Sequence, residues 1–168
     1  MTKSRIAVLG MAKSGKTHFL NTVEIEHLRK YGDTPLRKYF SMNELYDSTD
    51  YVRSNRHALN REGVWKKDQL ESLLLSKTYC DLLLVDDVLF EWELEVLKSF
   101  NFTLVYITSP WYSRFNRLHN PTHSDFKWMC SVEEINFLNS SNEMKNNFQM
   151  VEYVEECHDL HTFITTLI

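Results

Sequence analysis

Short apolar runs alternate with longer amphipathic segments along this chain. Four of the runs predict strands, and the first three carry the uninterrupted apolar character that is typical of strands buried on both faces of a parallel sheet. They lie at residues 5–9, 82–85, 103–107 and 150–154. Apolar residues at helical spacing predict helices between them. These lie at residues 15–31, 64–76, 91–100, from Pro110 onward, 131–138 and 160–167.

This alternation predicts an α/β fold in three α/β/α layers, with a mostly parallel sheet. Gly32 and Pro35 are expected to end the first helix. Residues 36–63 show no clean period, and we expect short helices and loops that line a cleft there. The 168 residues contain no repeat or linker, so residues 1–168 are predicted to form one domain.

Composition narrows the function classes without naming one. Hydrophobic residues make up 43% of the chain and the formal net charge is −4, which predicts a packed protein with no attraction to a nucleic-acid backbone. No apolar run approaches the roughly 20 residues that a membrane span needs. The three scattered cysteines favour a reduced, cytoplasmic protein. The sequence leaves open whether the protein forms a homodimer.

The strongest chemical signal is the phosphate-loop motif that runs from Gly10 to Thr17 between the first strand and the first helix. Glycines let a backbone wrap closely around phosphate, and the inward N–H groups of such a loop form a nest for anionic oxygens. Lys16 is expected to reach the outer phosphates and Thr17 to offer its hydroxyl to Mg²⁺. The predicted ATP-binding residues are Gly10, Ala12, Lys13, Ser14, Gly15, Lys16, Thr17 and His18.

Two aspartates follow the second apolar strand. Asp86 and Asp87 would meet the phosphate loop at the carboxyl edge of a parallel sheet, where ligands bind in such folds. A carboxylate at that place fits a magnesium ligand, direct or through water. The sequence leaves open which of the two faces the metal.

Arginines form two clusters that could grip phosphate groups through their planar, two-pronged heads. The first cluster is Arg53, Arg56 and Arg61, and the second is Arg114 and Arg117, three residues apart on one helix face. For any single arginine a solvated surface position is the better interpretation, whereas the two clusters together favour a function. Weaker candidates are Arg37 and Lys38 for phosphate, and aromatic residues for stacking on a base. These aromatic residues are Tyr39, Phe40, Tyr46 and Tyr51.

Taken in order, these features resemble the nucleoside monophosphate kinase group, and within it the deoxynucleoside monophosphate kinases of bacteriophages and other large DNA viruses. Those enzymes carry a stretch of the form Asp-Val-Arg-Phe-x-Asn-Glu after the second core strand. This chain matches it at Asp87, Val88, Phe90 and Glu93, and departs from it with Leu89 at the arginine position and Trp92 at the asparagine position.

The resemblance implies a P-loop kinase fold, ATP as donor, Mg²⁺ as cofactor and a deoxynucleoside monophosphate as the small-molecule acceptor. It implies that residues 36–63 bind the acceptor through Arg53, Arg56 and Arg61. It also implies that Lys16, Arg114 and Arg117 are catalytic, beside a lid-like region at residues 119–147, and that a viral relative would work in the host cytoplasm. Two alternatives stay open: a nucleotide hydrolase or switch, and a non-catalytic nucleotide-binding module. Leu89, at the arginine position of the family stretch, is the feature that supports the module.

Overall fold

Five parallel strands form the centre of the protein. The computed structural model describes residues 3–11, 13–32, 37–42, 45, 66–88, 90–120, 122–123, 149–152 and 159–168. The strands are β1 (Ser4–Leu9), β2 (Arg37–Ser41), β3 (Leu82–Asp86), β4 (Thr103–Thr108) and β5 (Gln149–Glu152). They lie in the order β2-β3-β1-β4-β5, and all four neighbouring pairs are parallel.

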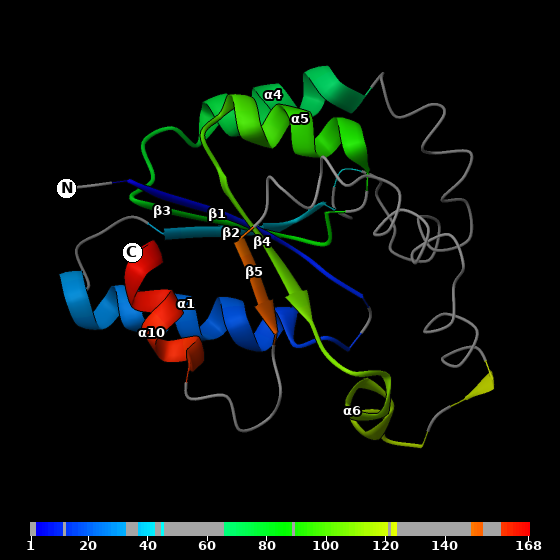
Figure 1. The fold of residues 1–168 in the computed structure, drawn as a ribbon. Helices are drawn as coiled ribbons and strands as arrows, with labels where there is room; N and C mark the ends of the chain where they lie inside the picture. The colour runs from blue at the N-terminus through cyan, green and yellow to red at the C-terminus, as the bar shows by residue number, and fades with distance from the viewer. Residues whose placement is uncertain are drawn as a thin grey trace.

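Helices cover both faces of the sheet. They are α1 (Lys16–Tyr31), α4 (Lys67–Ser76), α5 (Glu91–Ser99), α6 (Trp111–Asn116) and α10 (Asp159–Leu167). Figure 1 shows α4 and α5 on one face and α1 and α10 on the other, with α6 beyond the carboxyl end of β4. The predicted three-layer α/β/α fold with a mostly parallel sheet is therefore confirmed.

Alternation along each strand explains why the apolar runs are continuous. Ile6 and Val8 of β1 pack in the core under α1 and α10, whereas Ala7 and Leu9 pack in the core under α4 and α5. Successive side chains of a strand point to opposite faces, so a strand covered on both faces needs apolar residues at every position. The same division holds in β3, where Leu82 and Leu84 face α1.

The edge strand β2 corrects one expectation. Residues 36–63 were predicted to hold short helices and loops, yet 37–41 pair with β3. This strand has no continuous apolar run, because Lys38 and Tyr39 are exposed at the sheet edge while Phe40 is buried. Phe40 is part of the core, so the idea that it stacks on a base is wrong.

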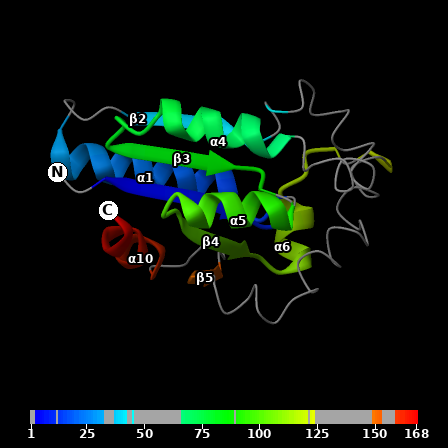
Figure 2. The same ribbon diagram turned by 90° about the horizontal axis from the view of Figure 1, so that it is seen from above.

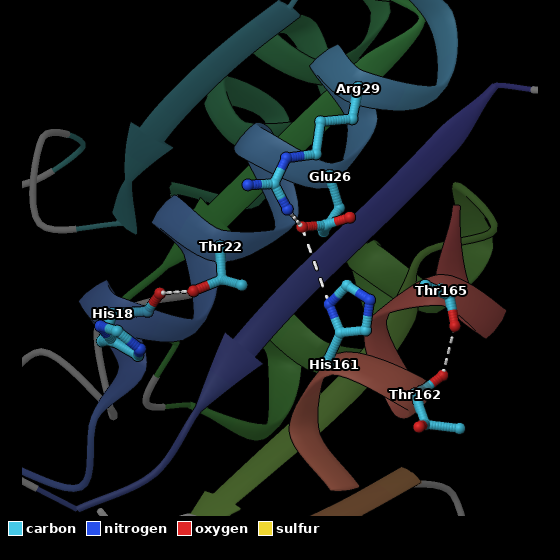
Figure 3. Close-up of polar contacts among 7 residues, drawn as sticks. All are labelled: His18, Thr22, Glu26, Arg29, His161, Thr162 and Thr165. Carbon is cyan, nitrogen blue, oxygen red and sulfur yellow. Dashed lines mark hydrogen bonds and ion pairs between the residues drawn. The ribbon is translucent and has the colours of Figure 1, made fainter. Parts of the chain in front are cut away.

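Polar contacts fasten the closing helix to the first one. Glu26 of α1 pairs with Arg29 of the same helix, and His161 of α10 places its Nδ1 3.7 Å from the same carboxylate oxygen (Figure 3). The hydroxyl of Tyr31 donates a hydrogen bond to the Ile168 carbonyl at 2.7 Å. These contacts lie toward the amino edge of the sheet and leave the carboxyl edge to other groups.

The carboxyl edge collects the polar residues of interest. Ser41 of β2 is in register with Asp86 of β3, and Leu9 of β1 is in register with Tyr106 of β4. The phosphate loop, Asp87 and the turn into α6 therefore leave the sheet at one edge, which Figure 2 shows from above at the side where α6 lies. Within the described ranges, no helix has the length and apolar character to cross a membrane.

Candidate functional site

The phosphate loop has the backbone conformations that the motif predicts. Gly10 has φ 154° and Gly15 has φ 107°. Residues other than glycine rarely adopt such positive φ angles. Gly10 is also pressed against β4, because a Cβ built on it would lie 2.4 Å from the Ile107 carbonyl oxygen. Its lack of a side chain is therefore required by space as well as by conformation.

Lys16 bends back over the loop that precedes it. Its Nζ donates hydrogen bonds to the carbonyl oxygens of Gly10, at 3.0 Å, and Met11, at 3.2 Å. The ammonium group thus lies at the loop. Phosphate oxygens carry charge and are stronger acceptors than neutral carbonyls, so an incoming phosphate can replace these partners.

The remaining loop residues divide between buried and exposed positions. Ser14 is 1% exposed, and its N–H donates to the Met11 carbonyl at 3.1 Å. Its Oγ has no hydrogen-bond partner among the described residues, which leaves a buried hydroxyl at the loop. Thr17 and His18 are exposed in the first turn of α1. Ala12 lies outside the described residues.

The two aspartates after β3 have different surroundings. Asp86 is 4% exposed, and burial together with the neighbouring charge of Asp87 raises its pKa to about 6, while Lys16 acts in the opposite direction. Asp87 has φ 59°, donates its N–H to Asp86 Oδ1 at 2.7 Å and accepts a hydrogen bond from Ser41 Oγ at 2.7 Å. Asp86 thus lies within electrostatic reach of Lys16, while Asp87 is tied to β2.

The raised pKa of Asp86 predicts a pH-dependent stability. Its ordinary pKa is 3.8, so the folded state holds more protons than the unfolded state between about pH 4 and 6, and the contribution is lost as pH rises through that range. The stability of Asp86→Asn relative to the unchanged protein should therefore rise by about 2 kcal/mol between pH 4 and pH 8, as measured by urea unfolding without nucleotide. Asp68→Asn, at an exposed position of α4, controls for lost charge. A gain that does not change with pH would contradict the burial argument.

Arg117, one of the two arginines after β4, reaches the loop. Arg117 Nη1 donates to the Lys13 carbonyl at 2.7 Å and to Ser109 Oγ at 3.1 Å. Arg114 is 4% exposed, and its backbone N–H bonds to the Pro110 carbonyl in the first turn of α6. Arg53, Arg56, Arg61 and Leu89 lie outside the described residues, as does most of the 119–147 region.

Two contributors to this edge, Ser41 and Ser109, were missed by sequence reasoning, and a third, Glu93, was noted only as part of the family-like stretch. Ser41 holds Asp87, Ser109 receives Arg117, and Glu93 accepts the Phe90 N–H at 3.0 Å and so caps the start of α5 beside Asp87. A usable signal existed for the two serines, since each is polar and stands at or just after the carboxyl end of a strand. Glu93 stands three residues after Phe90, the residue that directly precedes α5. At this spacing a carboxylate can reach back to the helix start.

The residues present suit a magnesium nucleotide. Thr17 and Asp86 supply oxygen donors, the atoms that Mg²⁺ prefers, and Mg²⁺ normally takes its other ligands from phosphates and water. The described ranges contain no group of three or more His, Cys, Asp or Glu side chains that could hold a metal ion. The buried Ser14 hydroxyl at the loop is a donor that fits an anion there.

Comparison with known proteins gives a fold likeness and no sequence family. No protein-family model and no curated protein sequence matches the chain. A shikimate kinase from Bacteroides thetaiotaomicron is 13% identical with a TM-score of 0.59, covering 98% of this chain and 96% of its own. A gluconokinase from Sinorhizobium meliloti 1021 is 13% identical with a TM-score of 0.56, covering 97% and 90%.

A sugar kinase from Janibacter sp. HTCC2649 is also 13% identical, with a TM-score of 0.56 over 98% of this chain and 94% of that one. At these identities the likeness concerns the fold. The strand order, the phosphate loop after β1 and these neighbours agree, and they show that the chain has the P-loop kinase fold.

Proposed function

We propose that this protein transfers the terminal phosphoryl group of ATP to a small-molecule acceptor. The observation that carries the proposal is the placement of Lys16. Its ammonium group donates hydrogen bonds to carbonyls of the phosphate loop, and its charge lowers the pKa of Asp86 at the end of the neighbouring strand β3. A loop of this kind binds triphosphate, and a carboxylate beside it suits Mg²⁺. The P-loop kinase neighbours support phosphoryl transfer at this coarse level.

The loop residues would bind the donor. The loop N–H groups and the start of α1 would hold the phosphates of ATP, because a helix start presents backbone donors and positive potential to anions. Thr17 and Asp86 would hold Mg²⁺, which supplies charge neutralisation on the phosphates when bound. Since Asp87 is tied to Ser41, we assign the metal role to Asp86.

The cations would stabilise the reaction. Lys16, with Arg114 and Arg117, would offset the negative charge that spreads over the phosphoryl oxygens. An acceptor oxygen attacks the terminal phosphorus, the bond to the bridging oxygen breaks, and ADP leaves. Catalysis then rests on positioning and charge, with no strong base needed when the attacking oxygen belongs to a phosphate.

For the acceptor we propose a nucleoside or deoxynucleoside monophosphate. This choice rests on the sequence resemblance, in particular Phe90 and Glu93 after the aspartates and the arginines at 53, 56 and 61. Monophosphates need cationic partners on the acceptor side, which these arginines would provide. Strand β2 ends at Ser41, at the carboxyl edge of the sheet beside Asp86.

A second acceptor class is favoured by one contact. Asp87 stands at the β2 side of the edge with Ser41 donating to it, and a carboxylate there can accept hydrogen bonds from alcohols but repels a phosphate. A hydroxylated acceptor such as gluconate, another sugar or shikimate, after which the neighbours are named, would suit that pair. The second candidate is therefore a kinase of small hydroxylated metabolites.

A panel assay separates these candidates. The protein is mixed with ATP and Mg²⁺ and with single acceptors from two sets, the nucleoside and deoxynucleoside monophosphates and the hydroxylated acids and sugars, while ADP formation is followed. Turnover that depends on a monophosphate supports the first acceptor class, and turnover that depends on an alcohol supports the second. ADP formation that no acceptor changes would point to a hydrolase, and nucleotide binding without turnover to a non-catalytic module.

A further inference from the structure

Arg117 joins the phosphate loop to the segment that follows β4, which is distant from it in the sequence. Its guanidinium donates to the backbone carbonyl of Lys13, 104 residues away, and to the hydroxyl of Ser109 at the end of β4. One planar head thus connects the phosphate loop to the turn between β4 and α6. Planar guanidinium groups are suited to such two-acceptor contacts, because their donors are fixed in direction.

The Lys13 carbonyl is a sensitive place in the loop. Lys13 has φ 60°, a conformation that a residue with a side chain adopts only when its surroundings hold it. The next N–H, that of Ser14, is bonded to the Met11 carbonyl at 3.1 Å. Carbonyl and N–H belong to one planar peptide group, so Arg117 and Met11 hold that plane from opposite ends.

Arg117 follows directly on helix α6, at its C-cap position. Arg114 of that helix is buried, and the rings of Trp111 and Phe115 stack within it at 5.0 Å with planes 13° apart. Arg117 therefore extends from the end of a regular helix. Lys16, the other cation on the loop, uses different carbonyls, those of Gly10 and Met11.

We propose that Arg117 is a positioning residue for the phosphate loop. By holding the Lys13–Ser14 peptide it fixes the turn from Met11 to Ser14 in the nucleotide-free protein, so that the loop is shaped for phosphate before any nucleotide arrives. The inference rests on the proposed phosphate-binding role of the loop and is independent of which acceptor the protein uses. It gives Arg117 a role in addition to neutralising charge.

Hydrogen exchange of the nucleotide-free protein tests the positioning directly. In Arg117→Met, the backbone amides of residues 10–17 should exchange roughly tenfold faster or more, because a charge-assisted hydrogen bond to the loop is lost. Exchange in β1 and β3 should stay unchanged. Lys98→Met is the matched control, since it removes an exposed cation from the last turn of α5, at the opposite edge of the sheet.

Binding supplies the second reading. Affinity for ATP and for inorganic tripolyphosphate should fall by a similar factor in Arg117→Met, because both bind the same loop. Arg117→Lys should restore part of the affinity and part of the loop protection, and Ser109→Ala should give a smaller change in both. An effect on ATP alone would place Arg117 against the nucleoside and overturn the assignment.

Two other outcomes would overturn it. Unchanged loop exchange together with weakened ATP binding would mean that Arg117 acts on bound phosphate only. Faster exchange spread evenly over the core strands would mean that Arg117 is an ordinary stabilising residue, and Ser109→Ala and Arg117→Lys would then share that pattern. The exchange measurement contains neither nucleotide nor acceptor, so it can succeed even if the protein transfers no phosphoryl group.

Discussion

Replacing Lys16 with methionine is expected to abolish phosphoryl transfer while the protein still folds. The ammonium group of Lys16 makes the hydrogen bonds to the loop carbonyls. Methionine keeps most of the side-chain volume and removes the charge. Loss of one preorganised charge from a phosphoryl-transfer site lowers turnover by roughly a hundred- to a thousandfold or more. Turnover is measured with ATP, Mg²⁺ and the acceptor that the panel assay identifies.

Folding and charge are controlled separately. Lys30→Met removes an exposed cation from the last turn of the same helix, α1, and should leave turnover unchanged. The unfolding free energy of Lys16→Met should fall by no more than about 1–3 kcal/mol, the range for hydrogen bonds to charged groups. Full activity in Lys16→Met would show that the loop does not have the role assigned to it.

Replacing Gly10 with alanine is expected to damage both stability and nucleotide binding. The added methyl group would meet the Ile107 carbonyl oxygen at 2.4 Å, closer than such atoms can come. That carbonyl cannot retreat, because β4 pairs with β1 on one side and with β5 on the other. The loop must therefore shift away from β4, at a cost of about 2–4 kcal/mol in the free energy of unfolding.

Gly32→Ala is the matched control for this substitution. Gly32 also has a positive φ, 76°, but an added Cβ would meet nothing within 4 Å. It should therefore show only the conformational cost of about 1 kcal/mol and keep full affinity for ATP. Thermal unfolding and ATP titration measure the two effects. Equal loss of stability in both variants, with ATP binding retained in Gly10→Ala, would remove the steric argument.

The features that could be predicted from the sequence are those that depend on residues close together along the chain. The phosphate loop is contiguous from Gly10 to Thr17, and the inner parts of β1, β3 and β4, at 6–9, 82–85 and 104–107, are hydrophobic throughout because both faces are covered. Strand β2 escaped notice because an edge strand needs only part of its residues in the core, and Phe40 meets that need. A period-based signal is weak in such a segment.

The pairings that complete the site are set by strand order, which local pattern does not determine. Ser41 meets Asp87 because β2 lies beside β3, and Arg117 meets Lys13 because β4 lies beside β1. The sequence placed both aspartates at the sheet edge and left their roles equal. Burial of Asp86 and the Ser41 contact of Asp87 separate them. The acceptor arginines at 53, 56 and 61 remain a prediction.

Tracing the terminal phosphoryl group of ATP tests the account most directly. ATP labelled in that group is incubated with the protein, Mg²⁺ and a pooled set of the monophosphate and hydroxylated acceptors, and the labelled products are separated. The account predicts that the label moves to an organic acceptor, and that it stays in ATP when Lys16→Met replaces the unchanged protein. Label that appears only as inorganic phosphate, or that never leaves ATP, would contradict the proposal that this P-loop fold is a phosphotransferase.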